Sequence, residues 1–300
     1  MDEDRPTPGI AEELSPGLRR VLADNPSPMT YWGTNTYLVG TRDIAVIDPG
    51  PDDAAHLAAI LGALDTGQRV SHVLVTHSHV DHSPLAHRLA RETGAQVHGF
   101  GLSHAGRSAI MTQLAASGLE DAGEGVDAGF APDVALSDGM VIEAEGWALE
   151  ALWTPGHLGN HMAFAVGDTV FCGDLVMGWA SSLVAPPDGD LTDFMASCRR
   201  LRIRGAKVFH SGHGAPIQDP MGRLDWLLAH REGREASILD ALRDGPADAQ
   251  SLARRVYTDT PVALLGAAAR NVLAHLIDLH GRNLVAPDGN LTATSRFELL

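Results

Sequence analysis

The segment that most restricts the fold of this chain is residues 76–82, which read Thr-His-Ser-His-Val-Asp-His. It follows the apolar run Val70–Thr76, whose Val- and Leu-rich composition predicts a buried strand. It precedes a helical pattern over Pro84–Thr93, for which we predict Ser83 as the N-cap and Pro84 as the first helical residue. Four of its side chains can bind a metal ion: His77, His79, Asp81 and His82. A turn between a strand and a helix can fold such side chains onto one point, so we interpret the segment as part of a metal centre.

The same kind of signal recurs three times later in the chain. Residues 154–157, 171–174 and 211–214 each follow a predicted strand and carry one His or Asp beside a glycine. Glycine lets the backbone approach a metal site closely. The side chains concerned are His157, Asp174 and His213. Their recurrence argues against the alternative interpretation of residues 76–82 as a solvated polar turn.

Strand-like and helix-like segments alternate from about residue 34 to residue 215, which favours a layered α/β domain. The expected strands are Thr34–Thr41, Asp43–Ile47, Val70–Thr76, Gln96–Phe100, Met140–Ala144, Trp147–Trp153, His161–Val166, Thr169–Cys172 and Lys207–His210. The expected helices are Asp53–Leu64, Pro84–Thr93, Gly106–Gly118 and Leu191–Arg202.

The last eighty residues change character. Three helical patterns are followed by the turn signal Pro-Asp-Gly-Asn, which is typical of a hairpin. The helices are Leu224–Leu242, Ala249–Val256 and Val262–His280, and the hairpin strands are Leu284–Ala286 and Leu291–Ala293. This order predicts a small winged-helix-like domain over residues 221–300, after a larger domain over residues 1–220.

Composition excludes several classes of protein. With 300 residues, 44% of them hydrophobic and 20% charged, the chain is neither disordered nor a coiled coil. No stretch approaches the roughly 18 consecutive apolar residues of a membrane span, and the acidic N-terminal residues are unlike a signal peptide. We therefore expect a cytoplasmic protein with no membrane partner. The net charge of −16 repels phosphate backbones and argues against duplex DNA as a partner.

The motif HxHxDH, followed in order by His157, Asp174 and His213, resembles the signature of the metallo-β-lactamase superfamily over about residues 30–215. The resemblance implies an αββα sandwich with a two-metal site at one edge. It makes His77, His79 and His157 the ligands of one metal. It makes Asp81, His82 and His213 the ligands of the second, with Asp174 bridging both. Seven nitrogen and oxygen donors are too many for one tetrahedral ion and suit two zinc ions, with iron or manganese as alternatives.

Other polar residues have two interpretations each. Asp48 matches an early aspartate of the family that holds the ligand segment, and equally suits a turn before Pro-Gly. His161 either orients the substrate or a ligand, or hydrogen-bonds at a strand start. We predict Asp81 and His161 as the candidate catalytic side chains. We predict that Cys172 is buried and packs in the core.

The predicted winged helix, the segment Thr34–Pro51 and the motif Gly189-Asp190-Leu191 resemble the β-lactamase-like endoribonuclease branch, which is similar to glyoxalase II. Two departures leave the substrate open. Ser83-Pro84-Leu85 replaces the usual small Gly-Gly step, and Asn160 replaces a frequent acidic residue.

The function that we predict is a two-metal hydrolase that uses a metal-bridging hydroxide on a small-molecule or acyl ester, thioester or phosphodiester. One alternative is a single-stranded RNA endonuclease. A second is a zinc-stabilised DNA-binding regulator, for which Val262–His280 offers few contacts: Arg270, Asn271 and His275. We expect instead that the C-terminal domain, with the loop Met177–Gly189 and its Trp179, forms a wall over the ions. The oligomeric state is open, and a homo-oligomer is compatible with the sequence.

Overall fold

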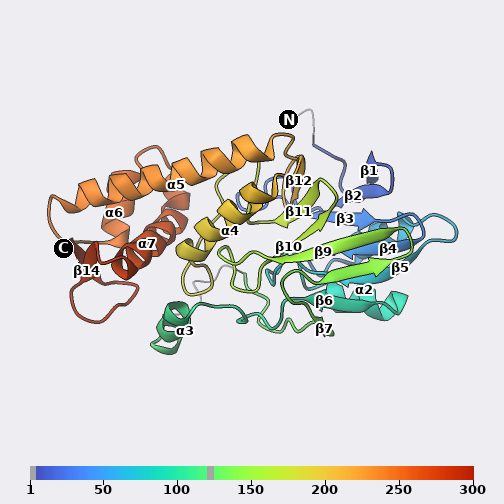
Figure 1. The fold of residues 1–300 in the computed structure, drawn as a ribbon, viewed down its shortest axis with the longest axis horizontal. Coiled ribbons are helices and arrows are strands. Elements are labelled where there is room, and N and C mark those ends of the chain that lie inside the picture. Colours follow the sequence, from blue (N-terminus) through green and yellow to red (C-terminus); the bar gives the residue numbers. More distant parts are fainter. Residues whose placement is uncertain (1–4, 120–124) are drawn as a thin grey trace.

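Two β-sheets lie face to face in the computed structural model, which describes residues 5–119 and 125–300 (Figure 1). The first sheet has its strands in sequence order, antiparallel from β1 to β4 and parallel from β4 to β7. Its strands are β1 (Ala11–Ser15), β2 (Leu18–Leu22), β3 (Asn35–Val39), β4 (Asp43–Ile47), β5 (Arg69–Leu74), β6 (Gln96–Gly99) and β7 (Val134–Ala135). The second sheet has the order β12-β11-β10-β9-β8. Its strands are β8 (Val141–Ala144), β9 (Trp147–Trp153), β10 (Met162–Val166), β11 (Thr169–Gly173) and β12 (Val208–Ser211).

Apolar side chains fill three layers around these sheets. Between the sheets, Tyr37 and Leu74 of the first pack with Phe164 of the second. Helices α1 (Ala54–Gly62) and α2 (Ala86–Thr93) cover the outer face of the first sheet. Helices α4 (Leu191–Arg204) and α5 (Pro220–Leu242) cover the outer face of the second sheet. The order of layers is therefore helix, sheet, sheet, helix, as the family resemblance implied.

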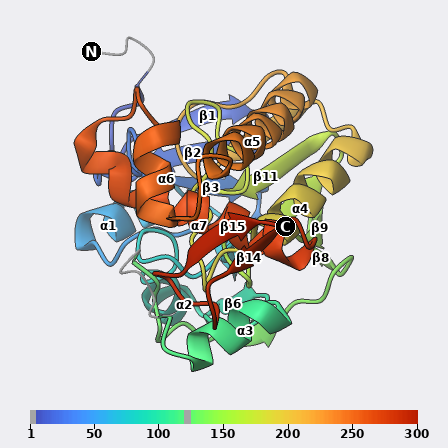
Figure 2. The ribbon, with the colours of Figure 1, turned by 90° about the vertical axis from the view of Figure 1, so that its left-hand side faces the viewer.

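The C-terminal residues form a winged helix beside one end of this sandwich (Figure 2). After α5 come β13 (Ala247–Asp248), α6 (Ala249–Val256), the 3₁₀ turn η1 (Val262–Leu264), α7 (Leu265–Gly281), β14 (Val285–Pro287) and β15 (Arg296–Leu299). Helix α3 (Ala109–Ala116) belongs to the first part of the chain, but its Met111 and Leu114 pack into the winged-helix core. The two parts therefore share apolar packing.

One helix of this part is long and apolar enough, by length and composition, to cross a membrane. It is Val262–Gly281, with a mean hydropathy of 1.4. Val272, Leu276 and Leu279 on this helix are buried in the winged-helix core. Of its most apolar window, 44% is buried inside the fold, so packing accounts for part of its apolar character.

Two expectations about local structure were wrong, and two strands were missed. Ser83 is not the N-cap of α2, because its hydroxyl donates to the Asp127 carboxylate and the His79 carbonyl, and the helix begins at Ala86. The second strand of the C-terminal hairpin is β15, because residues 292–295 form a turn closed by the Ser295 hydroxyl. Strands β1 and β2 were not predicted. Two arginines interrupt the apolar pattern of β2, and Arg20 is buried because its guanidinium bonds to Glu12 and to the Gly214 carbonyl.

Candidate metal centre

The ligand segment, residues 76–82, leaves the end of β5 and is fixed there by Asp48. The Asp48 carboxylate accepts hydrogen bonds from Thr76 N (2.7 Å), Thr76 Oγ1 (2.7 Å) and His82 Nδ1 (3.0 Å). Asp48 is 2% exposed and has a φ of +51°, in the left-handed region where Asp is tolerated better than most residues. Of its two predicted roles, the geometry favours the one that holds the ligand segment.

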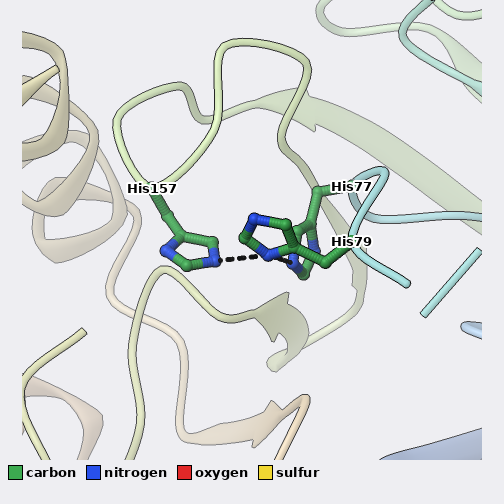
Figure 3. Close-up of side chains that lie close together, drawn as sticks. All are labelled: His77, His79 and His157. Carbon is green, nitrogen blue, oxygen red and sulfur yellow. Dashed lines mark hydrogen bonds between the residues drawn. The ribbon is translucent and has the colours of Figure 1, made fainter. Parts of the chain in front are cut away.

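Three histidines direct ring nitrogens at a common point (Figure 3). His77 Nε2 lies 2.9 Å from His79 Nδ1, and His157 Nε2 lies 3.1 Å from the same atom. His77 and His79 come from the ligand segment, and His157 comes from the loop after β9. The structure therefore brings together the three residues expected to hold one ion.

The remaining four expected ligands gather beside this group. Asp81 Oδ2 lies 3.3 Å from His82 Nε2 and 3.2 Å from His213 Nε2. Asp174, which follows β11, places Oδ1 at 3.6 Å from His82 Nε2 and Oδ2 at 3.2 Å from His213 Nε2. Asp174 Oδ2 also lies 3.9 Å from His157 Nε2, so this carboxylate faces both groups. That position agrees with the bridging role that the resemblance implies.

Hydrogen bonds on the far side of four imidazole rings fix which nitrogen carries the proton. A carbonyl or carboxylate oxygen only accepts, so His157 Nδ1 donates to Leu183 O, His213 Nδ1 to Gly33 O and His82 Nδ1 to Asp48. Thr76 Oγ1 donates to Asp48, so it accepts from His77 Nδ1. In the neutral form, each of these rings presents the Nε2 lone pair to the centre, as a metal ligand requires.

The charges of the centre favour a cation. Burial lowers the pKa of His79 to about 3, and burial together with the charge of His82 lowers that of His77, so both rings are neutral donors. Burial raises the pKa of the Asp174 carboxyl, but His213 and His82 outweigh it and hold it well below its usual value. Burial lowers the pKa of His213, but Asp174 and Asp81 raise it to about 10. The buried Asp174 carboxylate and the half-buried Asp81 carboxylate thus favour positive charge at this point.

Buried polar atoms without a hydrogen-bond partner indicate whether these residues fit metal ions. Among the residues that the structure describes, His82 Nε2 and Asp174 Oδ1 are buried without a hydrogen-bond partner. Three sets of three donors each lie within 4.8 Å of one another: His77, His79 and His157; His77, His82 and Asp174; Asp81, His82 and His213. The donors are imidazole and carboxylate with no thiolate, which suits zinc, iron or manganese. The seven residues fit a two-metal centre.

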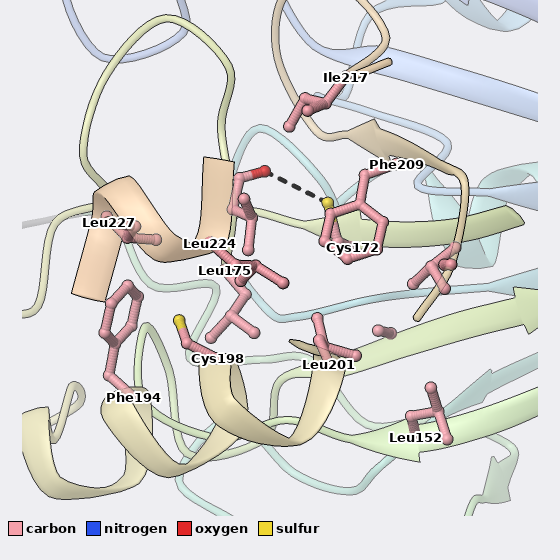
Figure 4. Close-up of a cluster of buried hydrophobic side chains, with 14 of the residues drawn as sticks. Leu152, Cys172, Leu175, Phe194, Cys198, Leu201, Phe209, Ile217, Leu224 and Leu227 are labelled. Atoms are coloured by element: carbon pink, nitrogen blue, oxygen red, sulfur yellow. Dashed lines mark hydrogen bonds between the residues drawn. The ribbon is translucent and has the colours of Figure 1, made fainter. Parts of the chain in front are cut away.

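His161 and Cys172 lie outside this set. His161 is buried, bonds through Nδ1 to Thr154 Oγ1 (2.9 Å), and its ring centre lies 5.2 Å from that of His77. It is therefore placed beside a ligand, and its catalytic role stays a prediction. Cys172 is 0% exposed in the core beneath α4 and α5, where its thiol approaches the Val176 carbonyl (Figure 4). The prediction that Cys172 is buried packing is confirmed.

A cavity of about 660 Å³, here called the metal-side cavity, opens over the donors. Five of the seven donors line it: His79, Asp81, His157, Asp174 and His213. Its other walls come from the loop Met177–Gly189, here called the wall loop, from residues 28–30 and from the N-terminal part of α7. Sequence reasoning identified the wall loop with Trp179, but it missed residues 28–30, which carry no chemical signal.

Comparisons with known proteins agree with this architecture. Residues 29–213 match the metallo-beta-lactamase superfamily, and residues 249–293 match the beta-lactamase associated winged helix domain. The chain therefore belongs to the metallo-beta-lactamase superfamily and is a hydrolase of it, with a C-terminal winged helix. The predicted division at residue 220 falls between the two matched regions and stays a prediction.

Individual relatives are similar over most of the chain. A beta-lactamase-like protein 2 homolog of Drosophila melanogaster is 31% identical over 279 residues, which cover 89% of this chain and 88% of the relative. An atrochrysone carboxyl ACP thioesterase of Claviceps purpurea is 33% identical over 237 residues, which cover 77% and 67%. The crystal structure of a metallo-beta-lactamase family protein from Thermus thermophilus has 27% identity and a TM-score of 0.76, with coverage of 96% and 100%.

Proposed function

We propose that this protein is a dinuclear metal hydrolase whose substrate is an acyl thioester. The observation that carries the proposal is the metal-side cavity, in which five metal donors form one wall and largely apolar or small side chains form the others. Such a cavity suits a substrate with one reactive polar bond and an apolar remainder. The relatives named as acyl-carrier-protein thioesterases support the thioester as that bond.

His77, His79 and His157 would hold one ion, and Asp81, His82 and His213 the other, with Asp174 between them. Ions bound there supply Lewis acidity and lower the pKa of water toward about 7. Hydrolysis adds water across the thioester, so that a C–O bond forms, the C–S bond breaks, and a carboxylic acid and a thiol are released. The Asp81 side chain is 21% exposed toward the cavity, and we assign it the role of holding the proton that water gives up.

Helix α5 holds the wall loop in place through two arginines. Arg223 donates to the carbonyls of Met177 (2.7 Å) and Ala180 (2.6 Å). Arg231 donates to the Ser182 carbonyl and to Asn271 Oδ1 on α7 (2.9 Å). The wall that would position the acyl group is therefore fixed from behind by hydrogen bonds, one of them buried and three partly buried, which favours a preformed site.

The position of α7 argues against the DNA-binding alternative. This helix would be the DNA-reading element of a winged helix. Its Asn271 instead accepts a hydrogen bond from Val184 N of the wall loop, and both Asn271 and Arg270 line the metal-side cavity. Two of the three side chains expected as DNA contacts thus face the hydrolase site, and the third, His275, is buried.

A substrate panel tests the proposal. The full-length, metal-loaded protein is assayed with an acyl thioester, an oxygen ester, a lactone, a β-lactam, a nitrophenyl phosphodiester and single-stranded RNA. We expect the highest kcat/KM with the thioester. Preferential cleavage of RNA or the phosphodiester would instead assign the protein to the endonuclease alternative.

The variant His79→Ala provides a matched test of the centre. It removes His79 Nδ1, the atom that lies close to both His77 Nε2 and His157 Nε2. We therefore expect loss of turnover with a retained circular dichroism spectrum. Wild-type rates from a metal-free preparation of this variant would contradict the proposal.

A further inference from the structure

Two hydroxyl side chains lie in the wall of the metal-side cavity that the winged helix supplies. Tyr257, which directly follows α6, and Thr260 both line this cavity, as do the metal donors His79 and Asp174. Thr260 N donates to the Tyr257 carbonyl (3.2 Å), so the two residues belong to one turn. The second part of the chain therefore places polar groups in the same space as the candidate metal centre.

Neither hydroxyl is used by the fold. Among the residues that the structure describes, neither the Tyr257 nor the Thr260 hydroxyl forms a hydrogen bond. Both residues are half-buried, yet neither oxygen is among the buried atoms that lack a partner, so each oxygen is accessible to solvent. The ring of Tyr257 packs against the winged-helix core, which fixes its position. The turn thus presents two held but unpaired hydroxyl groups, which a ligand in the cavity can reach.

Two guanidinium groups act on the Tyr257 phenol. Arg234 Cζ lies 4.3 Å from the centre of the Tyr257 ring, a distance typical of a cation–π contact. The second group is that of Arg231, which is 2% exposed. Both guanidinium groups donate to neutral oxygens of the fold, and no described carboxylate forms an ion pair with either of them. Their positive charge is therefore not neutralised by a neighbouring described side chain.

These charges make Tyr257 a stronger hydrogen-bond donor. Burial raises the pKa of its hydroxyl, while Arg231 and Arg234 counteract part of that rise. The phenol therefore carries its proton at neutral pH. A nearby positive charge stabilises electron density on the phenol oxygen and on any oxygen that accepts its proton. Tyr257 therefore favours an electron-rich acceptor, such as a carbonyl or carboxylate oxygen, over a second donor or a cation.

From these observations we infer that Tyr257, with Thr260, recognises a carbonyl or carboxylate oxygen on the acyl group of the substrate. The thioester lies at the metal donors, and the second oxygen function of the acyl group meets the hydroxyl groups of the turn. The inference rests on the proposed thioesterase function and narrows its substrate class to oxygenated acyl thioesters. Tyr257 is a specificity residue in this arrangement, because it contacts the substrate away from the reacting bond.

Tyr257→Phe tests the inference, because it removes the hydroxyl and keeps the ring that Arg234 contacts. In the full-length, metal-loaded protein, kcat/KM is measured for octanoyl N-acetylcysteamine and for analogues with an oxo group along the chain or a carboxylate at its end. We expect the wild type to prefer an oxygenated analogue. Tyr257→Phe should lower the ratio of that kcat/KM to the octanoyl value about tenfold, through the lost hydrogen bond. The preferred analogue shows whether the acceptor is a carbonyl or a carboxylate.

Thr260→Val and Thr258→Val form a matched pair of variants in the same turn. Each replaces a hydroxyl by a methyl group, but Thr260 lines the metal-side cavity, whereas Thr258 is exposed and does not line it. Thr260→Val should lower the ratio in the same direction as Tyr257→Phe, and Thr258→Val should keep the wild-type ratio. A wild type without preference for any oxygenated analogue, or an unchanged ratio in Tyr257→Phe, would overturn the inference.

A binding experiment separates this inference from the proposed function, because it needs no turnover. The chain has three tyrosines, so protein labelled with ¹³C at tyrosine Cζ gives three signals, and the one absent from Tyr257→Phe belongs to Tyr257. The remaining signals, of Tyr31 and Tyr37, report that this variant keeps its fold. The ligands are amides that correspond to the octanoyl thioester and to its oxygenated analogues.

An oxygenated amide should shift the Tyr257 signal, whereas the octanoyl amide should leave it in place. That result supports the recognition of an acceptor oxygen even if no thioester is hydrolysed. Thioester hydrolysis without a shift, or with equal shifts from both kinds of amide, would overturn the inference and leave the thioesterase proposal standing.

Discussion

Asp48 contacts no substrate cavity, yet it organises the metal centre from behind. Its carboxylate accepts three hydrogen bonds from two residues, Thr76 and His82, and through Thr76 Oγ1 it also orients His77. It does so with a φ of +51°, a backbone conformation that costs free energy for most residues. The arrangement of the candidate metal ligands thus depends on a residue that is not one of them.

Asp48→Asn should lower metal affinity about 10- to 100-fold while the fold is kept. Asparagine tolerates the left-handed backbone conformation. Its amide NH₂, however, would replace Asp48 Oδ2, which accepts hydrogen bonds from Thr76 Oγ1 and His82 Nδ1, and an NH₂ group cannot accept them. Competition with a chromogenic chelator measures the affinity. An unchanged affinity would show that the hydrogen bonds of Asp48 do not orient the ligands.

Asp174→Ala tests the number of ions. We expect about two metal equivalents per chain in the wild type and one or fewer in the variant, because Asp174 faces both groups of donors. Elemental analysis of protein loaded with excess zinc and then desalted provides the count. A wild-type protein that takes up no second ion would contradict the dinuclear centre.

His275 should make the protein less stable in acid. Burial, together with positive charges that include Arg231, lowers its pKa to about 3, and neither ring nitrogen has a hydrogen-bond partner among the described residues. Its pKa is about 6.5 when unfolded, so between pH 6.5 and pH 3 the unfolded state binds the proton. The contribution to stability is fully present above pH 6.5 and is lost as the pH falls toward 3.

Urea unfolding of His275→Leu at several pH values measures this contribution. The variant should gain stability relative to the wild type as the pH falls below 6.5, by about 1.4 kcal/mol per unit of pKa difference. The exposed His104→Gln serves as a control with the wild-type profile. Parallel profiles for the wild type and His275→Leu would exclude this role.

At the scale of elements, the position of the wall loop depends on hydrogen bonds from α5. Arg231 is 2% exposed, stacks over the Phe194 ring at 5.2 Å and bonds to both the wall loop and α7. No described carboxylate forms an ion pair with it. Its function in the fold is therefore to join three elements by hydrogen bonds.

Arg231→Met should weaken substrate binding without loss of metal. The variant leaves the buried Ser182 O without this donor, at a cost of about 1–3 kcal/mol, while Asn271 Oδ1 loses one of its two donors and keeps Val184 N. We expect a raised KM, a lower melting temperature and an unchanged metal content. If the variant lost metal as its KM rose, the raised KM would come from damage to the metal centre and not from movement of the wall loop.

The elements themselves were predictable where apolar periodicity dominates. Strands β4 and β9 and helix α6 begin and end where their sequence patterns do. The start of α2, the strand β2 and the strand β15 were not predictable, because side chains distant in sequence or local hydroxyl bonds override the pattern there. A single sequence does not show which partner occupies a hydroxyl or a guanidinium group.

At the scale of the whole molecule, the sandwich and the winged helix share a core. Leu224 and Leu227 of α5 and Ala274 of α7 are buried with Phe194 and Leu201 of α4. In the same way, α3 of the first part packs into the second. The two parts are therefore expected to unfold together.

A chain cut after residue 220 should not fold stably. It would expose the apolar face that α5 covers, and a large exposed apolar patch favours aggregation. Calorimetry of the full-length protein should show one transition, while the truncated chain should show none or precipitate. A cooperative transition in the truncated chain would show that the winged helix is dispensable for the sandwich.

The sequence alone predicted the class of fold and the seven candidate metal donors that the structure brings together. Ligands must be of particular chemical types at the ends of particular strands, so that His77, His79, Asp81, His82, His157, Asp174 and His213 can be identified from residue type and position. The tertiary structure alone decided what surrounds that centre. The packing of α7 and the wall loop beside it arises from contacts between segments about 40 to 90 residues apart, and those contacts depend on shape and packing, which no local pattern encodes.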